Sequence, residues 1–212
     1  MSDVTFQFDP KQQFQLDAID ATVSLFSGQP RSGQAGGNLS IEVGGGTGEG
    51  LYQHALGLGN QLTISRNQVL KNLQAAQDKQ GLMPDSSLIP ALPDDTDAPA
   101  PMNFTISMET GTGKTYVYLR TLFELNQRYG FTKFIIVVPS VAIKEGVYKS
   151  LQMTEPHFKG LYDNTPFDYF VYDSQKLGQV RNFATSDTIQ IMVINIDAFR
   201  KSFDDPDKAD KA

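Results

Sequence analysis

The sequence predicts an α/β fold built on a parallel sheet, and three observations support this prediction. Short apolar strands alternate with amphipathic helices from residue 104 to residue 194. A glycine-rich turn at residues 108–115 joins the first of these strands to the first helix. Residues 134–138 form a continuous apolar run, which is typical of a strand that is buried on both faces. Alternating strands and helices give a parallel sheet with right-handed crossovers.

Composition narrows the class of protein. The chain has 212 residues, of which 40% are hydrophobic, as in ordinary globular proteins. It has no cysteine, which excludes disulfides and thiolate metal sites and fits the cytoplasmic location that we expect. No segment approaches the ~20 apolar residues of a membrane-spanning helix, so we expect no membrane partner. His54 and His157 lack carboxylates at ligand spacing, which argues against a zinc site.

The net charge of −6 comes from the N-terminal half. Residues 1–100 have 5 Lys/Arg and 11 Asp/Glu, whereas residues 101–212 have 13 of each. An acidic total argues weakly against nucleic-acid binding, which usually needs a basic face. The second half can still present a local basic patch, because charge is not spread evenly over a folded surface.

The first hundred residues predict an extension of helices and a glycine-rich insertion. Residues 4–8 alternate like a short strand, and residues 11–26 have apolar side chains at helical spacing. Residues 27–59 contain 11 of the 18 glycines, which predicts a flexible loop without secondary structure. Residues 62–80 resume a helical pattern. Residues 84–101 carry five prolines and predict an extended connector.

The second half predicts the sheet domain. Strands are expected at residues 104–108, 134–138, 169–172 and 189–194, with helices at residues 115–129 and 141–151. We therefore divide the chain into a strand and helix at 1–27, a glycine-rich insertion at 28–60, a helix and linker at 61–101, and a partial nucleotide-binding domain at 102–212.

Residues 108–115 have the pattern of a phosphate-binding loop. They read Met-Glu-Thr-Gly-Thr-Gly-Lys-Thr between a predicted strand and a predicted helix, the context that a phosphate-binding loop requires. Gly111 and Gly113 permit positive φ, so that successive N–H groups point at phosphate oxygens, and the helix start adds its positive dipole end. Lys114 supplies a charge for the β- and γ-phosphates, and Thr115 supplies a hydroxyl for Mg²⁺.

The loop departs from the strict consensus where Met108 replaces glycine, which we interpret as the mark of the helicase-type sub-class. The alternative is a glycine-rich turn that binds nothing, and the strand-to-helix context disfavours it. We therefore predict ATP and Mg²⁺ as cofactors. The predicted binding residues are Glu109, Thr110, Gly111, Thr112, Gly113, Lys114 and Thr115.

Further stretches are more specific than the loop alone. They are residues 116–120, 134–147, 167–174, 180–183 and 194–199. Together with the loop they resemble the N-terminal part of the restriction (Res) subunit of type III restriction–modification enzymes, over about half of the chain. Because that family is similar to superfamily 2 helicases, the resemblance implies a P-loop NTPase domain of the RecA-like type, incomplete here. It also implies an ATP-dependent subunit that moves along and cuts double-stranded DNA, with a modification methyltransferase subunit as partner.

The resemblance suggests three further sites. Gln15 resembles the glutamine that reads adenine in such motors, since an amide both donates and accepts, while an exposed helix glutamine is the alternative. Pro139 and Ser140 resemble the first motif that contacts the DNA backbone, with ordinary strand termination as the alternative. Asn195 belongs to a second, less specific motif of that kind, for which a plain strand-to-loop transition is the alternative.

Residues 154–157 superficially resemble the Asp-Glu-x-His box of helicases, which binds Mg²⁺ and supplies the catalytic glutamate. We reject them, because Thr154 replaces the first acid and the preceding residues read as a helix rather than a buried strand. The family places that box beyond Ala212, and Glu109 is no substitute for a positioned base. We therefore expect no catalytic residue in this chain, and weak binding of MgATP without hydrolysis.

Two other functions stay open at this point. One is a P-loop ATPase of the kinase or transporter type that does not act on DNA, for which we find neither a substrate pocket nor a catalytic acid. The other is a module that only binds its ligands.

Overall fold

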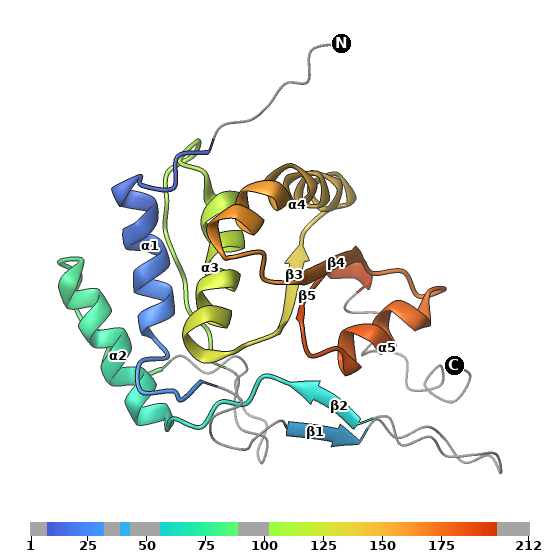
Figure 1. Ribbon diagram of the computed structural model, residues 1–212. Coiled ribbons are helices and arrows are strands. Elements are labelled where there is room, and N and C mark those ends of the chain that lie inside the picture. The colour runs from blue at the N-terminus through green and yellow to red at the C-terminus, as the bar shows by residue number, and fades with distance from the viewer. Residues whose placement is uncertain (1–7, 32–38, 43–55, 89–101, 199–212) are drawn as a thin grey trace.

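The computed structural model describes residues 8–31, 39–42, 56–88 and 102–198 (Figure 1). Its centre is a three-stranded parallel sheet of order β3-β5-β4. The strands are β3 (Lys133–Val138), β4 (Phe167–Val171) and β5 (Ile189–Asn195), and the helices that alternate with them are α3 (Lys114–Tyr129), α4 (Val141–Leu161) and α5 (Leu177–Thr185). The predicted α/β class and parallel sheet are confirmed.

The central strand β5 is buried along its first six residues, but its neighbour β3 is not. Ile135 is 47% exposed and Val137 is 42% exposed, so the prediction that residues 134–138 are covered on both faces is wrong. The reason is position in the sheet. Among the described strands β3 lies at an edge of the sheet. Helix α5 covers the second face of the sheet at β4, where Phe183 contacts Phe170, and Ile135 and Val137 of β3 stay exposed on that face.

The segment that leads into the glycine-rich turn is not a strand. Residues 103–109 have neither helical nor strand structure, which contradicts the strand expected at 104–108. An apolar run becomes a strand only where a partner strand accepts its hydrogen bonds, and no described strand pairs with this one. The segment instead lines a groove with α1 (Gln13–Ser24) and α2 (Arg66–Lys79), and Ile106 remains 48% exposed there.

The glycine-rich insertion contains secondary structure that the sequence did not predict. Strands β1 (Leu39–Glu42) and β2 (Leu56–Gly59) pair in antiparallel register. Asn60, directly after β2, ties this hairpin to the start of β3, because its side chain bonds the backbone N–H groups of Thr132 and Lys133 and the carbonyl of Lys133. Outside the described residues lie 32–38 and 43–55 of the insertion, 4–7 of the strand expected at 4–8, and 89–101 of the connector.

The helices follow their predicted ranges with two departures. Helices α1, α2 and α3 agree with prediction to within a few residues, and α2 begins where the Ser65 hydroxyl accepts the Gln68 N–H. Helix α4 runs ten residues past the predicted end, through Pro156. It continues because buried side chains such as Leu151 and Phe158 hold both of its halves against the core. Helix α5 was not predicted.

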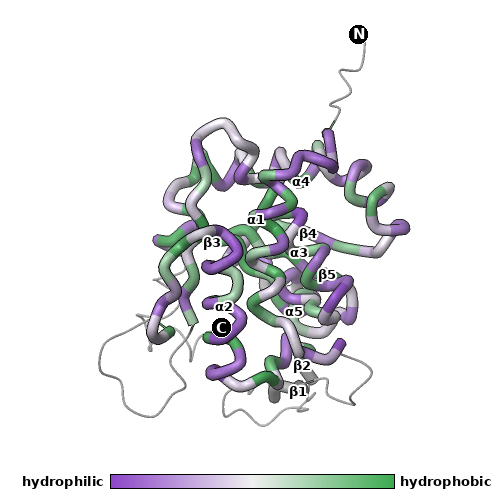
Figure 2. Tube along the Cα trace, turned by 90° about the vertical axis from the view of Figure 1, so that its left-hand side faces the viewer, coloured by the Kyte–Doolittle hydropathy of each residue, from purple (hydrophilic) through white to green (hydrophobic). Residues whose placement is uncertain are grey.

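Aromatic side chains form much of the core between α3, α4 and the sheet. Phe123 of α3 lies 4.8 Å from Phe158, 5.1 Å from Tyr162 and 5.0 Å from Phe167, measured between ring centroids. By contrast, α2 buries only Val69 and is largely hydrophilic along its length (Figure 2). Among the described residues, no helix combines the length and apolar character needed to cross a bilayer.

Candidate nucleotide-binding site

The turn before α3 has the backbone shape that a phosphate-binding loop needs. Gly111 and Gly113 both adopt φ of +83°, in the left-handed region that only glycine enters without strain. Helix α3 begins at Lys114 and its N-cap, Gly113, provides no side-chain cap. The first N–H groups of α3 therefore have no acceptor among the described residues, and such groups together with the helix dipole favour an anion.

Two side chains of the loop converge on one carbonyl oxygen. The Lys114 ammonium donates to the carbonyl of Glu109 over 2.7 Å, and the Thr112 hydroxyl donates to the same oxygen over 2.7 Å. Lys114 is exposed, so its ammonium folds back over the loop while two of its three N–H donors have no protein partner in the described part of the chain. A phosphate oxygen placed in the loop would meet these donors.

Gln15 reaches the loop from the first turn of α1. It is only 8% exposed, which contradicts the alternative of an exposed helix glutamine. Its Nε2 donates to the carbonyl of Thr112 over 2.9 Å. A Cβ atom on Gly113 would lie 2.6 Å from that Nε2, so a side chain at this position would displace the Gln15 amide and would also have to adopt a left-handed φ. Gln15 Oε1 has no hydrogen bond among the described residues.

Thr115 is the residue for which the sequence predicts a contact with Mg²⁺. It is the second residue of α3 and lies beside the phenol of Tyr118, where burial raises the pKa of Tyr118 and the Thr115 hydroxyl offsets part of that rise. One hydroxyl is a single ligand, and Mg²⁺ in such sites takes its other oxygens from phosphates and water. Within the described residues, no group of three or more His, Asp and Glu is close enough to hold a metal ion without a nucleotide.

The residues expected to contact DNA lie together at the carboxyl ends of two neighbouring strands. Pro139 and Ser140 follow β3 and are exposed, and the Ser140 hydroxyl caps α4 by accepting the Ile143 N–H over 3.3 Å. Asn195 ends β5 opposite Val138, and its Oδ1 accepts the backbone N–H of Ala198 over 3.2 Å. The start of α3 points to the same end of the molecule (Figure 1).

The acidic residue of the rejected box is engaged elsewhere. Glu155 lies inside α4 and accepts hydrogen bonds from Lys159 and Tyr169, each over 2.7 Å. The bond from Lys159 contributes most, and the bond from Tyr169 less, to a pKa of the Glu155 carboxyl that lies below its usual range. His157 bonds the phenol of Tyr116 over 3.0 Å, and burial lowers its pKa. Both side chains stabilise the packing of α4, in agreement with the rejection. His54 lies outside the described residues.

Sequence reasoning missed two features near the loop. One is the groove of about 950 Å³ that α1, α2 and residues 104–109 line. The other is Arg120, which is buried on α3 and bonds the carbonyl of Pro10. Its only sequence signal is a charged side chain among the core-facing positions of a helix.

Comparison with known proteins identifies the family. The family described as "Type III restriction enzyme, res subunit" matches residues 12–212. The chain belongs to this family. The Res subunit of the type III restriction-modification enzyme StyLTI of Salmonella typhimurium is 40% identical over 110 residues, which cover 44% of this chain and 11% of that protein. The EcoPI Res subunit of Escherichia phage P1 is 34% identical over 121 residues, 56% of this chain and 12% of that protein.

A third Res subunit, that of EcoP15I from Escherichia coli, is 42% identical over 76 residues, which cover 35% of this chain and 8% of that protein. The matched stretches therefore span only a small part of each Res relative. The family match itself runs over Gln15, the glycine-rich loop and the ends of β3 and β5.

Proposed function

We propose that this chain is the ATP-binding part of a type III Res subunit. The observation that carries the proposal is the loop geometry: Gly111 and Gly113 in the left-handed region, an uncapped α3, and an ammonium at Lys114 that hangs over the loop. Backbone N–H groups and one lysine in this arrangement suit the triphosphate of a nucleotide. Glu109, Thr110 and Thr112 are the other loop residues that would surround the triphosphate.

Gln15 supplies the base contact in this proposal. Its Nε2 stays on the carbonyl of Thr112, so the amide plane is fixed next to the loop. The open Oε1 can accept from the amino group of adenine, and the second N–H of Nε2 can donate to a ring nitrogen. The base would then lie on the α1 side of the loop, while the phosphates lie over the start of α3.

Mg²⁺ would be held by the Thr115 hydroxyl together with phosphate oxygens, and bound Mg²⁺ neutralises charge on the triphosphate. Lys114 would exchange the Glu109 carbonyl for phosphate oxygens when the nucleotide enters. Among the described residues, the glutamate of the rejected box, Glu155, lies in α4 with both carboxylate oxygens bonded, so it is not available to activate water. The chain is therefore proposed to bind MgATP without hydrolysing it.

Double-stranded DNA is the proposed macromolecular ligand of the whole protein. Support comes from the exposed Pro139 and Ser140 at the N-terminus of α4, and from Asn195 on the adjacent strand end. A helix N-terminus at a strand end offers N–H groups to backbone phosphates. The whole Res subunit is proposed to move along and cleave DNA with ATP, together with a modification methyltransferase subunit, in the cytoplasm.

The test is a titration of the 212-residue chain with MgATP, followed by a measurement of phosphate release. We expect saturable binding and no release above the level of a Lys114→Ala variant. Absence of binding at millimolar MgATP contradicts the nucleotide site, whereas release that depends on Lys114 contradicts the claim that the chain lacks a catalytic residue.

A further inference from the structure

The five residues before α1 are attached to α3 at two points. The ring of Phe8 stacks on Tyr116 with 5.9 Å between centroids and 9° between planes. The carbonyl of Pro10 accepts a hydrogen bond from Nη1 of Arg120 over 2.7 Å. Tyr116 and Arg120 are one helical turn apart, so one face of α3 holds this segment.

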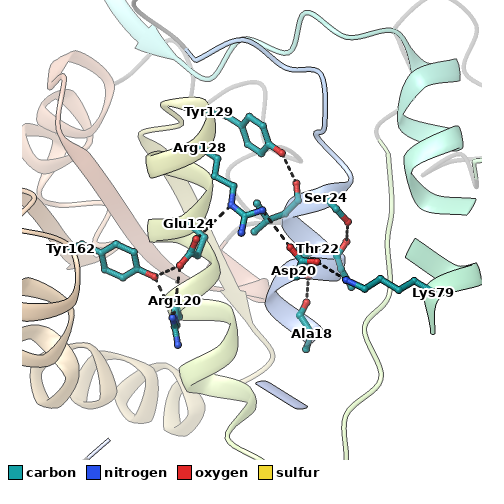
Figure 3. A network of polar contacts seen from close by, with 12 residues as sticks. Ala18, Asp20, Thr22, Ser24, Lys79, Arg120, Glu124, Arg128, Tyr129 and Tyr162 are labelled. Carbon is teal, nitrogen blue, oxygen red and sulfur yellow. Dashed lines mark hydrogen bonds and ion pairs between the residues drawn. The ribbon is translucent and has the colours of Figure 1, made fainter. Parts of the chain in front are cut away.

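The other end of the Arg120 guanidinium is held by Tyr162 and Glu124. Its Nε donates to the phenol oxygen of Tyr162 over 3.3 Å and lies 3.9 Å from Glu124. The Tyr162 phenol donates in turn to Glu124 over 2.7 Å (Figure 3). Burial, followed by the Glu124 carboxylate, raises the pKa of Tyr162, so the phenol keeps the proton that it donates. The guanidinium therefore has a single well-determined direction, toward Pro10.

A buried arginine needs an explanation other than packing. The side chain of Arg120 is only 10% exposed, and an apolar residue of similar size would fill the space without the cost of burying a charge. What an apolar residue cannot do is donate to the Pro10 carbonyl. Charged donors make shorter and stronger bonds to such oxygens than neutral donors do.

Pro10 lies shortly before the first turn of α1. The carbonyl of the N-cap residue Gln12 accepts the N–H groups of Gln15 and Leu16, so α1 begins at Gln13, three residues after Pro10, and Gln15 lies in its first turn. Lys114 is the first residue of α3, the helix that also carries Arg120. The positions of the Lys114 ammonium and of the Gln15 amide are thus both linked to α3, one directly and the other through Arg120 and Pro10.

We propose that Arg120 is a positioning residue of the nucleotide site, which holds Gln15 at a fixed offset from Lys114 and thereby gives the loop its preference for adenine nucleotides. This inference rests on the proposed function. Arg120 does not touch the nucleotide. Its effect is therefore on the choice of base and not on the affinity for the phosphates.

The experiment compares three ligands with Mg²⁺: ATP, GTP and inorganic tripolyphosphate, each titrated into the 212-residue chain. We expect the wild type to prefer ATP, and Arg120→Met to lower the ATP-to-GTP affinity ratio by up to about tenfold, as expected when the neutral hydrogen bonds between the Gln15 amide and adenine are lost, with tripolyphosphate affinity unchanged. Arg120→Lys, which retains a charged donor, should recover part of the ratio.

The matched control is Arg128→Met. Arg128 lies two turns further along α3 and pairs with the same Glu124 and with Asp20 of α1, but in the described part of the chain it contacts none of residues 8–12. It should keep the wild-type ratio. If Arg120→Met does not fold, Pro10→Gly tests the same link from its other end, because it leaves Arg120 in place and loosens the residue that it holds.

The outcomes distinguish the positioning role of Arg120 from the proposed nucleotide-binding function. A folded Arg120→Met or Pro10→Gly chain with the wild-type ATP-to-GTP ratio, or one that loses all three ligands equally, overturns the positioning role alone. A wild-type chain that binds no tripolyphosphate overturns the proposed function, and the positioning role with it.

Discussion

Replacing Gly113 with alanine tests the contact between α1 and the loop. The new Cβ would sit at φ of +83°, which costs a residue with a side chain ~1–2 kcal/mol. It would also lie 2.6 Å from Gln15 Nε2, so that side chain must move and give up its 2.9 Å bond to Thr112. Losing that bond adds about 1 kcal/mol, for a total loss of stability of ~2–3 kcal/mol.

Gly111→Ala is the matched control. Gly111 has the same φ of +83°, but a Cβ there meets no atom within 4 Å. It should cost only the backbone strain of ~1–2 kcal/mol. The difference between the two variants therefore isolates the contact with Gln15.

Urea unfolding followed by far-ultraviolet circular dichroism measures both free energies, since the chain has no tryptophan. Repeating the pair in a Gln15→Ala background should abolish the difference between Gly113→Ala and Gly111→Ala. Equal costs in the wild-type background, or a difference that persists without the Gln15 amide, refute the close approach.

Three other outcomes follow from packing and charge. Phe123→Ala, at 2% exposure, should lower the free energy of unfolding by ~3–5 kcal/mol, whereas Phe14→Ala at 49% exposure should cost far less; similar costs contradict the assigned core. Burial lowers the pKa of His157, so as the pH falls below the ordinary histidine value of 6.5 the unfolded chain takes up a proton before the folded chain does, and the free energy of unfolding should decline. His157→Gln should reduce this dependence of the free energy of unfolding on pH in denaturant titrations. Ser140→Ala removes the cap of α4 and should cost ~1 kcal/mol; an unchanged urea midpoint contradicts the cap.

Local signals were sufficient for much of the fold. The helical spacing of apolar residues located α1, α2 and α3, and glycine spacing predicted the left-handed turn at Gly111 and Gly113. These features depend on residues within one or two turns of each other. The family resemblance, carried by the strands and the loop together, is confirmed by the match over residues 12–212.

Features that depend on distant partners were not predictable. Whether residues 104–108 form a strand, and whether Ile135 is covered, depends on which strands pair beside them. Helix α4 passes through Pro156 because the core holds both of its halves, against the local preference of proline. The bond between Arg120 and Pro10 joins residues 110 positions apart. The roles of the individual site residues remain predictions.

The affinity of the chain for MgATP before and after Lys114→Ala tests the nucleotide site most directly. Lysine is removed from the start of α3 while both glycines and the uncapped helix stay in place, and Lys149→Ala, an exposed lysine on α4, is the control for lost charge. Isothermal titration should show at least about a tenfold weaker complex for Lys114→Ala, as expected for a charge-assisted contact, and wild-type affinity for Lys149→Ala. Equal affinity of the wild type and Lys114→Ala would contradict a triphosphate-binding loop at this position.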